Sequence, residues 1–221
     1  MDYSADQRVV MTLDAGGTNF VFSAMQGGRE IVSPVHQTAC VNSQSRCLAQ
    51  IAAGFRAVRE QLSENPVAIS FAFPGPADYP AGIIGDLPNF PAFRGGVALG
   101  PFLEEQFGLP VFIQNDGALF AYGEALAGAL PEVNDRLAEA GSTKRYRNLL
   151  GVTLGTGFGG GVVINGELLI GDNATGGCVW CFRNKKYPNL IAEESVSIRA
   201  VKRVYRELSG DTAELTPKEI F

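Results

Sequence analysis

A supersecondary pattern that occurs twice limits the folds open to this chain. From Arg8 the sequence predicts a buried strand, a turn rich in glycine and threonine, a second strand, a hairpin turn at Gly27-Gly28 and a third strand, REIVSPV. From Asn148 the same order returns, with NLLGVTL running into a Gly-Thr turn and a hairpin turn at Asn165-Gly166. The repeat predicts two related half-domains that face each other, with both Gly-Thr turns lining one cleft.

The two turns, DAGGTN and LGTGFGGG, hold seven of the 27 glycines of the chain. Backbone N–H groups and a threonine hydroxyl at such turns donate to phosphate oxygens without the bulk of a side chain. The sequence therefore favours a phosphate-binding cleft. Glycines that only permit tight hairpins are the alternative explanation of the same pattern.

Helices and strands are predicted between and after the repeats. Apolar residues recur at helical spacing over residues 45–65 and predict an amphipathic helix that starts near Cys47, for which we expect a packing role. His36, the only histidine, is expected to be structural. Strands are predicted over residues 67–73 and 110–116, helices over 101–108, 117–130 and 193–210, and a polar, partly helical link over 131–148.

The C-terminal end carries a strong helix-start signal. Thr216 is predicted as the N-cap, Pro217 as the first helical residue and Glu219 as the partner that completes a capping box. Because the chain ends at Phe221, one turn into this helix, we expect the second half-domain to be incomplete.

Composition excludes several classes of protein. Hydrophobic residues make up 46% and charged residues 19% of the chain, as in an ordinary globular protein. The net charge of −5 argues against a nucleic-acid partner. No apolar run approaches the ~18–20 residues of a membrane-spanning helix, and the N-terminus lacks the apolar region of a signal peptide. Four cysteines are too few for a disulfide scaffold, so we expect a cytoplasmic protein with no membrane partner.

Asp116 is a candidate catalytic residue on chemical grounds. The letters QND end an apolar strand where a helix begins, which places Asp116 at the strand edge where α/β folds bind ligands. Phosphoryl transfer needs alignment, charge neutralisation and one base near the nucleophile. A helix N-cap is the alternative role for Asp116, and a turn-forming aspartate is the alternative role for Asp14.

Five motifs, in this order, resemble the ROK family of sugar kinases, which belongs to the actin-like ATPase superfamily: LDAGGTNFVFSAM, FAFPGPAD, LPNFPAF, IQNDGALFAYGEA and LGTGFGGGVVINGELLIGDNATGG. The resemblance runs from about Arg8 to about Arg206. It implies an α/β, RNase H-like (actin-like ATPase) fold with two half-domains around a cleft. These would be residues 1–117 and an incomplete second half-domain, residues 118–221.

The resemblance also implies a reaction, the transfer of the γ-phosphoryl group of ATP to a hydroxyl of a hexose or N-acetylhexosamine. Asp116 would be the general base, and Asp14 would lie near Mg²⁺ and contact it through water. The residues implied to bind ATP and its phosphates are Asp14, Gly16, Gly17, Thr18, Gly155, Thr156, Gly157, Gly159 and Gly160. Those implied to bind the sugar are Asn89, Asn115, Asp116 and Glu193. A homodimer is expected only by analogy.

The segment GDNATGGCVWC departs from the family pattern. Cys178 and Cys181 stand where the family has a sugar-binding Glu and His, and Trp180 stands where it has Gly. In the family that His also ligates a structural zinc with three downstream cysteines, which this segment does not offer. A redox pair and half a zinc site are the alternatives for C-x-x-C. Structural zinc usually has four ligands, so we expect no zinc and a sugar loop in which two ligands are replaced.

The replacement supports a second functional hypothesis. Losing a hydrogen bond to a charged group typically costs ~1.5–3 kcal/mol, so sugar affinity would fall. The alternative to a sugar kinase is therefore a non-catalytic member of the family that binds sugar or nucleotide, or an inactive fragment.

Overall fold

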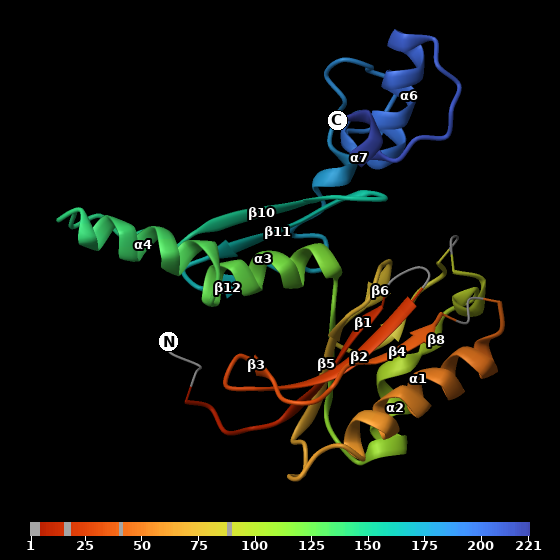
Figure 1. Cartoon of the computed structure of the whole chain (residues 1–221), viewed down its shortest axis with the longest axis vertical. Helices are drawn as coiled ribbons and strands as arrows, with labels where there is room; N and C mark the ends of the chain where they lie inside the picture. Colours follow the sequence, from red (N-terminus) through yellow and green to blue (C-terminus); the bar gives the residue numbers. More distant parts are fainter. Residues whose placement is uncertain (1–4, 16–18, 40–41, 88–89) are drawn as a thin grey trace. The chain divides into compact units, whose positions relative to one another are not determined.

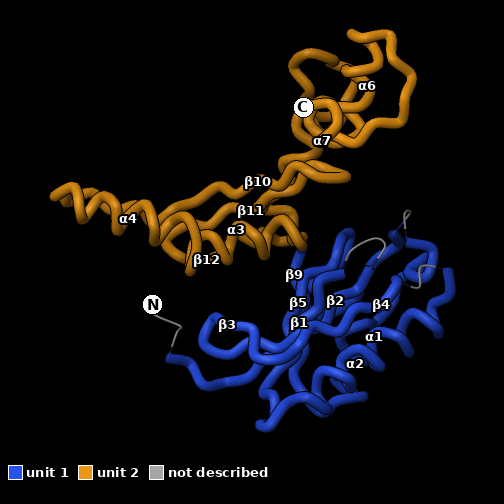
Figure 2. Tube along the Cα trace, viewed as in Figure 1, with its two compact units in different colours: residues 1–115 blue, residues 116–221 orange. Residues whose placement is uncertain are grey.

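The computed structural model describes residues 5–15, 19–39, 42–87 and 90–221. The chain divides into two compact units, unit 1 (residues 1–115) and unit 2 (residues 116–221), coloured separately in Figure 2. Each unit is described by itself.

Unit 1 is built on a six-stranded mixed sheet. Its strands are β1 (Val10–Ala15), β2 (Asn19–Gln26), β3 (Arg29–Glu30), β4 (Val35–Thr38), β5 (Ala68–Ala72) and β9 (Val111–Gln114). The order is β3-β2-β1-β5-β9, and β4 also pairs with β2. β1 is antiparallel to β2, whereas β1, β5 and β9 run parallel to one another, so their carboxyl ends lie at one edge.

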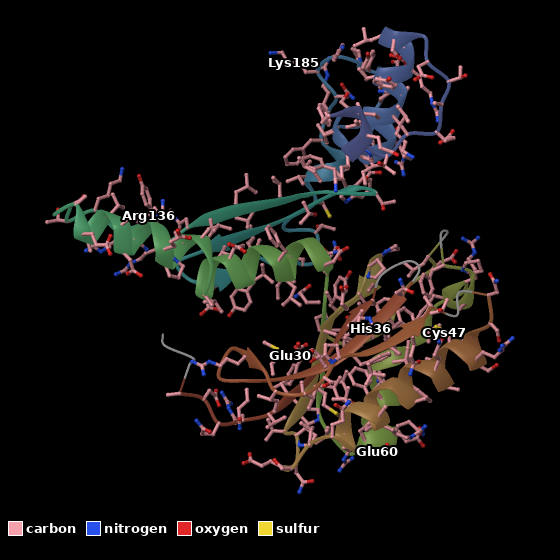
Figure 3. The ribbon with its side chains drawn as sticks, in the orientation of Figure 1. Glu30, His36, Cys47, Glu60, Arg136 and Lys185 are labelled. Atoms are coloured by element: carbon pink, nitrogen blue, oxygen red, sulfur yellow. The ribbon has the colours of Figure 1, made fainter. Side chains whose placement is uncertain are left out.

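Two helices, α1 (Gln44–Arg59) and α2 (Leu99–Phe107), pack beside this sheet (Figure 1). The core between α1 and β2 is aromatic, with the rings of Phe22 and Phe55 edge to face at 5.2 Å. A Cβ on Gly54 would lie 2.3 Å from the Phe22 ring, so glycine lets α1 approach β2. Cys47, on α1 (Figure 3), is fully buried, which confirms its predicted packing role.

A small sheet completes unit 1. It contains β6 (Ala77–Asp78), β7 (Ile83–Ile84) and β8 (Val97–Ala98), with the 3-10 helix η1 (Pro91–Phe93) before β8. The peptide bond between Gly75 and Pro76, just before β6, is cis. Tyr79, in the turn that follows β6, is buried and contributes to the candidate site below.

Two predictions in unit 1 need correction. The third strand predicted over residues 29–35 is two short strands, β3 and β4, that both pair with β2. Pro34 lies between them and has no N–H to donate to a strand ladder. The predicted helix over residues 45–65 ends at Arg59, before the turn residues Glu60 and Gln61. The hairpin turn at Gly27-Gly28 is confirmed, and both glycines have positive φ angles.

Unit 2 begins with two helices and a three-stranded antiparallel sheet. The elements are α3 (Asp116–Leu126), α4 (Ala129–Glu139), β10 (Leu149–Leu154), β11 (Phe158–Ile164) and β12 (Glu167–Leu168), and α3 packs on β10 and β11 (Figure 1). The predicted helix over residues 117–130 is therefore interrupted at Gly128, and α4 fills part of the predicted link. The predicted hairpin turn at Asn165-Gly166 is confirmed, with φ angles of 53° and 85°.

The rest of unit 2 is a series of short elements: the 3-10 helix η2 (Val179–Cys181), α5 (Glu193–Val196), α6 (Ile198–Ser209) and α7 (Pro217–Ile220). The helix predicted over residues 193–210 is broken at Ser197, whose buried side chain caps α6. Gly210 ends α6 with a φ of 71°, at the C-terminal limit predicted for this helix. The predicted capping box of Thr216 and Glu219 is confirmed.

Within the described ranges, the structure has no helix that is long and apolar enough to cross a membrane.

Candidate active site

The predicted site residues fall into three groups. Gly16, Gly17, Thr18 and Asn89 lie outside the described residues. Asp14 and Asn115 belong to unit 1. The remaining predicted residues belong to unit 2: Asp116, Gly155, Thr156, Gly157, Gly159, Gly160 and Glu193.

Asp14 lies near the carboxyl end of β1, where the parallel strands of unit 1 end. Asp14 pairs with Ala72 on β5, and Ala72 pairs with Gln114 on β9, so these residues lie side by side across the sheet. With two strand spacings between them, the backbones of β1 and β9 are roughly 10 Å apart here. Asn115 follows Gln114 directly and shares this edge with the exposed Asp14. The structure thus brings two predicted site residues together where α/β folds bind ligands.

Asn115 is oriented by a tyrosine that sequence reasoning missed. The Nδ2 of Asn115 donates to the hydroxyl of Tyr79 over 3.3 Å, and this hydroxyl donates to the carbonyl oxygen of Phe73 over 3.0 Å. Only 6% of Tyr79 is exposed. A Cβ on Gly75 would lie 2.9 Å from the Tyr79 hydroxyl, so the glycine in the PGP turn leaves room for it. The only signal in the sequence was that Tyr79 lies close to this turn.

Asp116 is the first residue of α3, and its side chain is exposed. Its Oδ1 accepts a hydrogen bond from the backbone N–H of Gly117 over 2.8 Å. Among the residues that the structure describes, its carboxylate forms no ion pair. Asp116 therefore takes part of the helix N-cap role that was its alternative assignment, and its carboxylate stays accessible to solvent.

The start of α3 is fixed against β11 by glycines. A Cβ on Gly117 would lie 2.5 Å from the backbone nitrogen of Gly160, and a Cβ on Gly161 would lie 2.8 Å from the Cα of Ala118. Only glycine permits backbones to approach this closely. Asp116 therefore lies one residue from a fixed contact between α3 and the glycine-rich strand.

The predicted second phosphate segment divides into a turn and a strand. Leu154 pairs with Phe158, which leaves a three-residue turn of Gly155, Thr156 and Gly157 between β10 and β11. The N–H of Gly155 donates to the carbonyl oxygen of Gly157 over 3.0 Å, and a Cβ on Gly155 would meet no atom within 4 Å. The turn is thus open on the side of Gly155.

Gly159 and Gly160 lie within β11 rather than in the turn. A Cβ on Gly159 would lie 2.6 Å from the Thr153 hydroxyl, and one on Gly160 would lie 2.8 Å from the carbonyl oxygen of Gly151. Close packing therefore gives these two glycines a structural role. Their binding of phosphate stays a prediction.

Glu193, the first residue of α5, has a carboxylate that is already engaged by the protein. Its Oε2 accepts a hydrogen bond from the N–H of Phe158 over 2.9 Å, and its Oε1 accepts one from Arg199 over 2.8 Å. Arg199 also donates to Glu194 over 2.8 Å. Hydrogen bonds to Glu194 and Glu193 raise the pKa of the Arg199 guanidinium. The predicted sugar-binding role of Glu193 is untested, and Arg199 was not singled out in the sequence.

Cys178 directly precedes the short helix η2 and Cys181 is its last residue, and both are free thiols. The Cys181 thiol lies 3.2 Å from the Cys178 carbonyl oxygen, and its side chain is exposed. Val179, between them, is buried beside Gly160. In the part of the chain that the structure describes, no three His, Cys, Asp or Glu side chains form a group that could hold a metal ion.

The comparisons with known proteins agree on one family. The chain matches the ROK family over residues 10–178. It is similar to the crystal structure of a glucokinase from Parabacteroides distasonis ATCC 8503, with 73% identity and a TM-score of 0.91 over 99% of this chain and 62% of that chain. Against the glucokinase of Thermotoga maritima it has 30% identity over 165 residues, which is 74% of this chain and 47% of that protein.

A more distant structure shows the shared fold. A ROK family glucokinase from Streptomyces griseus, solved in complex with glucose and AMPPNP, is 22% identical, with a TM-score of 0.69 over 92% of this chain and 62% of that chain. The predicted actin-like ATPase fold is therefore confirmed, although this chain spans only about half the length of the Thermotoga maritima glucokinase. The chain belongs to the ROK family.

Proposed function

We propose that this chain carries out the phosphorylation of a hexose or N-acetylhexosamine hydroxyl by ATP. The observation that carries the proposal is the 73% identity, over 99% of this chain, to a protein described as a glucokinase. The placement of Asp14 and Asn115 at the carboxyl edge of the unit 1 sheet supports it. Glucose is accordingly the first sugar to test.

In this proposal Asp116 is the general base. Its carboxylate would accept the proton of the sugar hydroxyl as the oxygen of that hydroxyl forms a bond to the γ-phosphorus of ATP and the bond to ADP breaks. The hydrogen bond from the Gly117 N–H orients the carboxylate, and its exposure leaves it accessible. The contact between Gly117 and β11 would keep this geometry rigid during the reaction.

The turn of Gly155, Thr156 and Gly157 would bind phosphate oxygens of ATP with its backbone N–H groups and the Thr156 hydroxyl. Gly16, Gly17 and Thr18 would act in the same way, with Gly159 and Gly160 supporting the second turn. Mg²⁺ is commonly held by one or two carboxylates together with substrate phosphates and water. A single exposed carboxylate at the sheet edge, that of Asp14, fits this ligand set. The ion would neutralise charge on the phosphates.

Sugar binding would rest on Asn115, Asp116, Asn89 and Glu193. The bond to Tyr79 holds the Asn115 amide in place before the sugar arrives, which lowers the entropic cost of binding. The assignment of residues 1–117 and 118–221 to two facing half-domains, a homodimer and a cytoplasmic location also stay proposals.

One observation favours a second candidate function, a non-catalytic protein that binds sugar or nucleotide. Thiols are weak hydrogen-bond donors and acceptors, and two of them occupy the segment around η2. If the sugar contacts this segment, its hydroxyls would find poorer partners than a carboxylate and an imidazole. Binding without turnover would then be the outcome.

The deciding experiment measures ADP release from Mg·ATP with glucose, mannose, fructose, N-acetylglucosamine and N-acetylmannosamine. Asp116→Asn should lower the rate with the preferred sugar by about 10²–10⁴-fold, because general-base catalysis contributes that much. Asp135→Asn, the same change at an exposed position on α4, is the control and should leave the rate unchanged. Calorimetry that detects sugar binding, with no ADP released for any sugar, would favour the second candidate.

A further inference from the structure

The turn between β10 and β11 is held in place from outside its own hairpin. On one side, the N–H of Phe158 donates to Oε2 of Glu193 over 2.9 Å. On the other side, the carbonyl oxygen of Gly155 accepts a hydrogen bond from the N–H of Ile198, also over 2.9 Å. Both ends of the turn are therefore tied to one segment, residues 193–198.

This segment is itself rigid. Ser197 is fully buried, and its N–H donates to the carbonyl oxygen of Glu193 over 3.0 Å. Its hydroxyl accepts a hydrogen bond from Ala200 at the start of α6. The Glu193 side chain is only 20% exposed, and a Cβ on Gly157 would lie 2.7 Å from its Oε2. Glycine at position 157 is thus what allows the carboxylate to reach the turn.

Arg199 compensates the negative charge that Glu193 places next to the turn. A bare carboxylate next to a turn that binds phosphates would repel them. Arg199 lies 2.8 Å from Oε1 of Glu193 and offsets this charge, while Oε2 remains bonded to Phe158. Arg199 also bridges to Glu194, which fixes the guanidinium from a second side.

We propose that Glu193 and Arg199 are positioning residues for the nucleotide side of the reaction. Glu193 sets the shape of the turn of Gly155, Thr156 and Gly157, and Arg199 keeps Glu193 in place and compensates its charge. The proposal rests on the proposed function, in which this turn binds phosphates of ATP. It gives Glu193 a role on the nucleotide side in addition to the sugar contact proposed above.

The test compares Glu193→Ala and Arg199→Ala with Glu194→Ala as the matched control. Glu194 contacts the same arginine, but its side chain has no hydrogen bond to the turn among the described residues. We expect the Phe158 amide to exchange with solvent about tenfold faster in Glu193→Ala, since a hydrogen bond to a charged group is lost. Glu193→Gln keeps an acceptor and should restore most of that protection.

Calorimetry on the same variants measures the Kd for Mg·ATP and the Kd for glucose. The Kd for Mg·ATP should rise about tenfold in Glu193→Ala and Arg199→Ala, and the Kd for glucose should also rise in Glu193→Ala, because Glu193 is a proposed sugar ligand. Glu194→Ala should change neither. An unchanged Phe158 exchange rate, a loss confined to glucose binding, or a wild-type chain that does not bind Mg·ATP would each overturn the assignment.

The assignment and the proposed function fail in different ways. If the wild-type chain releases ADP with glucose but the variants bind Mg·ATP normally, the assignment is wrong and the kinase function stands. If no sugar drives ADP release but Mg·ATP binding weakens in both variants, the assignment stands and the kinase function is wrong. Arg199 is about half exposed, so its variant should fold even if Glu193→Ala does not.

Discussion

At the scale of single residues, the candidate site depends on side chains that hold other side chains. Tyr79 holds Asn115, and Arg199 holds Glu193. Neither supporting residue was recognisable in the sequence, because each meets its partner through the fold rather than through a fixed spacing. Tyr79 lies in the turn after β6 and 36 residues before Asn115 in the chain.

Tyr79→Phe tests this kind of support. The substitution removes the hydroxyl that bonds to both Asn115 and the Phe73 carbonyl oxygen in a buried position. We expect the free energy of unfolding in urea to fall by about 1–3 kcal/mol, because a buried acceptor loses its partner. Glucose should also bind more weakly. The control is Tyr205→Phe, which removes an exposed hydrogen bond to Asp211 and should cost less than about 0.5 kcal/mol. Equal losses in the two variants would contradict the assigned role of Tyr79.

At the scale of elements, the packing of α3 on β11 is a contact between two backbones. A Cβ on Gly117 would lie 2.5 Å from the nitrogen of Gly160, so the helix would have to move away from the strand. By contrast, a Cβ on Gly123 of the same helix would meet no atom within 4 Å. One helix thus offers a crowded glycine and an open one.

Alanine substitution at these two positions should have opposite effects. Gly117→Ala should lower the free energy of unfolding by about 1–3 kcal/mol through overpacking. Gly123→Ala should raise it by up to about 1 kcal/mol, because alanine favours the helical backbone. Denaturant unfolding of both variants measures the difference. A Gly117→Ala variant as stable as Gly123→Ala would mean that α3 does not pack on β11 in this way.

The sequence predicted elements best where local chemistry decides. Hairpin turns at Gly27-Gly28 and Asn165-Gly166 and the capping box at Thr216 were correct, because each depends on a few adjacent residues. The break at Ser197 was missed because residues 193–210 have a helical pattern throughout. Its cause is a tertiary one, the tie between Ile198 and Gly155.

The site was predictable in part for the same reason. The strand-to-helix junction at Asp116 follows from local pattern, and its place at the start of α3 is confirmed. The engagement of Glu193 by Phe158 was not predictable, since the two residues lie 35 residues apart in the chain. The resemblance implied that Gly159 and Gly160 bind phosphate together with the turn, and the structure places both in β11.

At the scale of the whole molecule, the two units differ in the size of their cores. Unit 1 buries large side chains among its described residues, including Phe20, Phe22, Phe55, Phe71, Phe73 and Phe93. In unit 2 the buried apolar residues that the structure describes are small: Ala121, Ala125, Val163, Val179 and Ala200. Because burial of a Phe side chain contributes about 1.5–3 kcal/mol, unit 1 should be the more stable of the two.

Hydrogen exchange should show this difference directly. Amides in β1 and β5 should exchange at least about tenfold more slowly than amides in β10 and β11, and they should be the last to exchange as denaturant is added. Unfolding of the whole chain would then occur in more than one step. Uniform protection across both sets of strands, lost in a single step, would contradict the difference in stability.

The glycine contact between α3 and β11 has a consequence for the mutations that this protein can accept during evolution. A contact between two side chains can be repaired after a mutation, because a larger residue on one side is accommodated by a smaller one on the other. A larger residue at Gly117 or Gly160 cannot be accommodated in this way, because neither glycine has a side chain that could be replaced by a smaller one. A library that randomises both positions together should therefore yield few functional pairs, whereas exposed positions on α4 should accept most replacements. The segment next to Asp116 is thereby expected to be among the least adaptable parts of the chain.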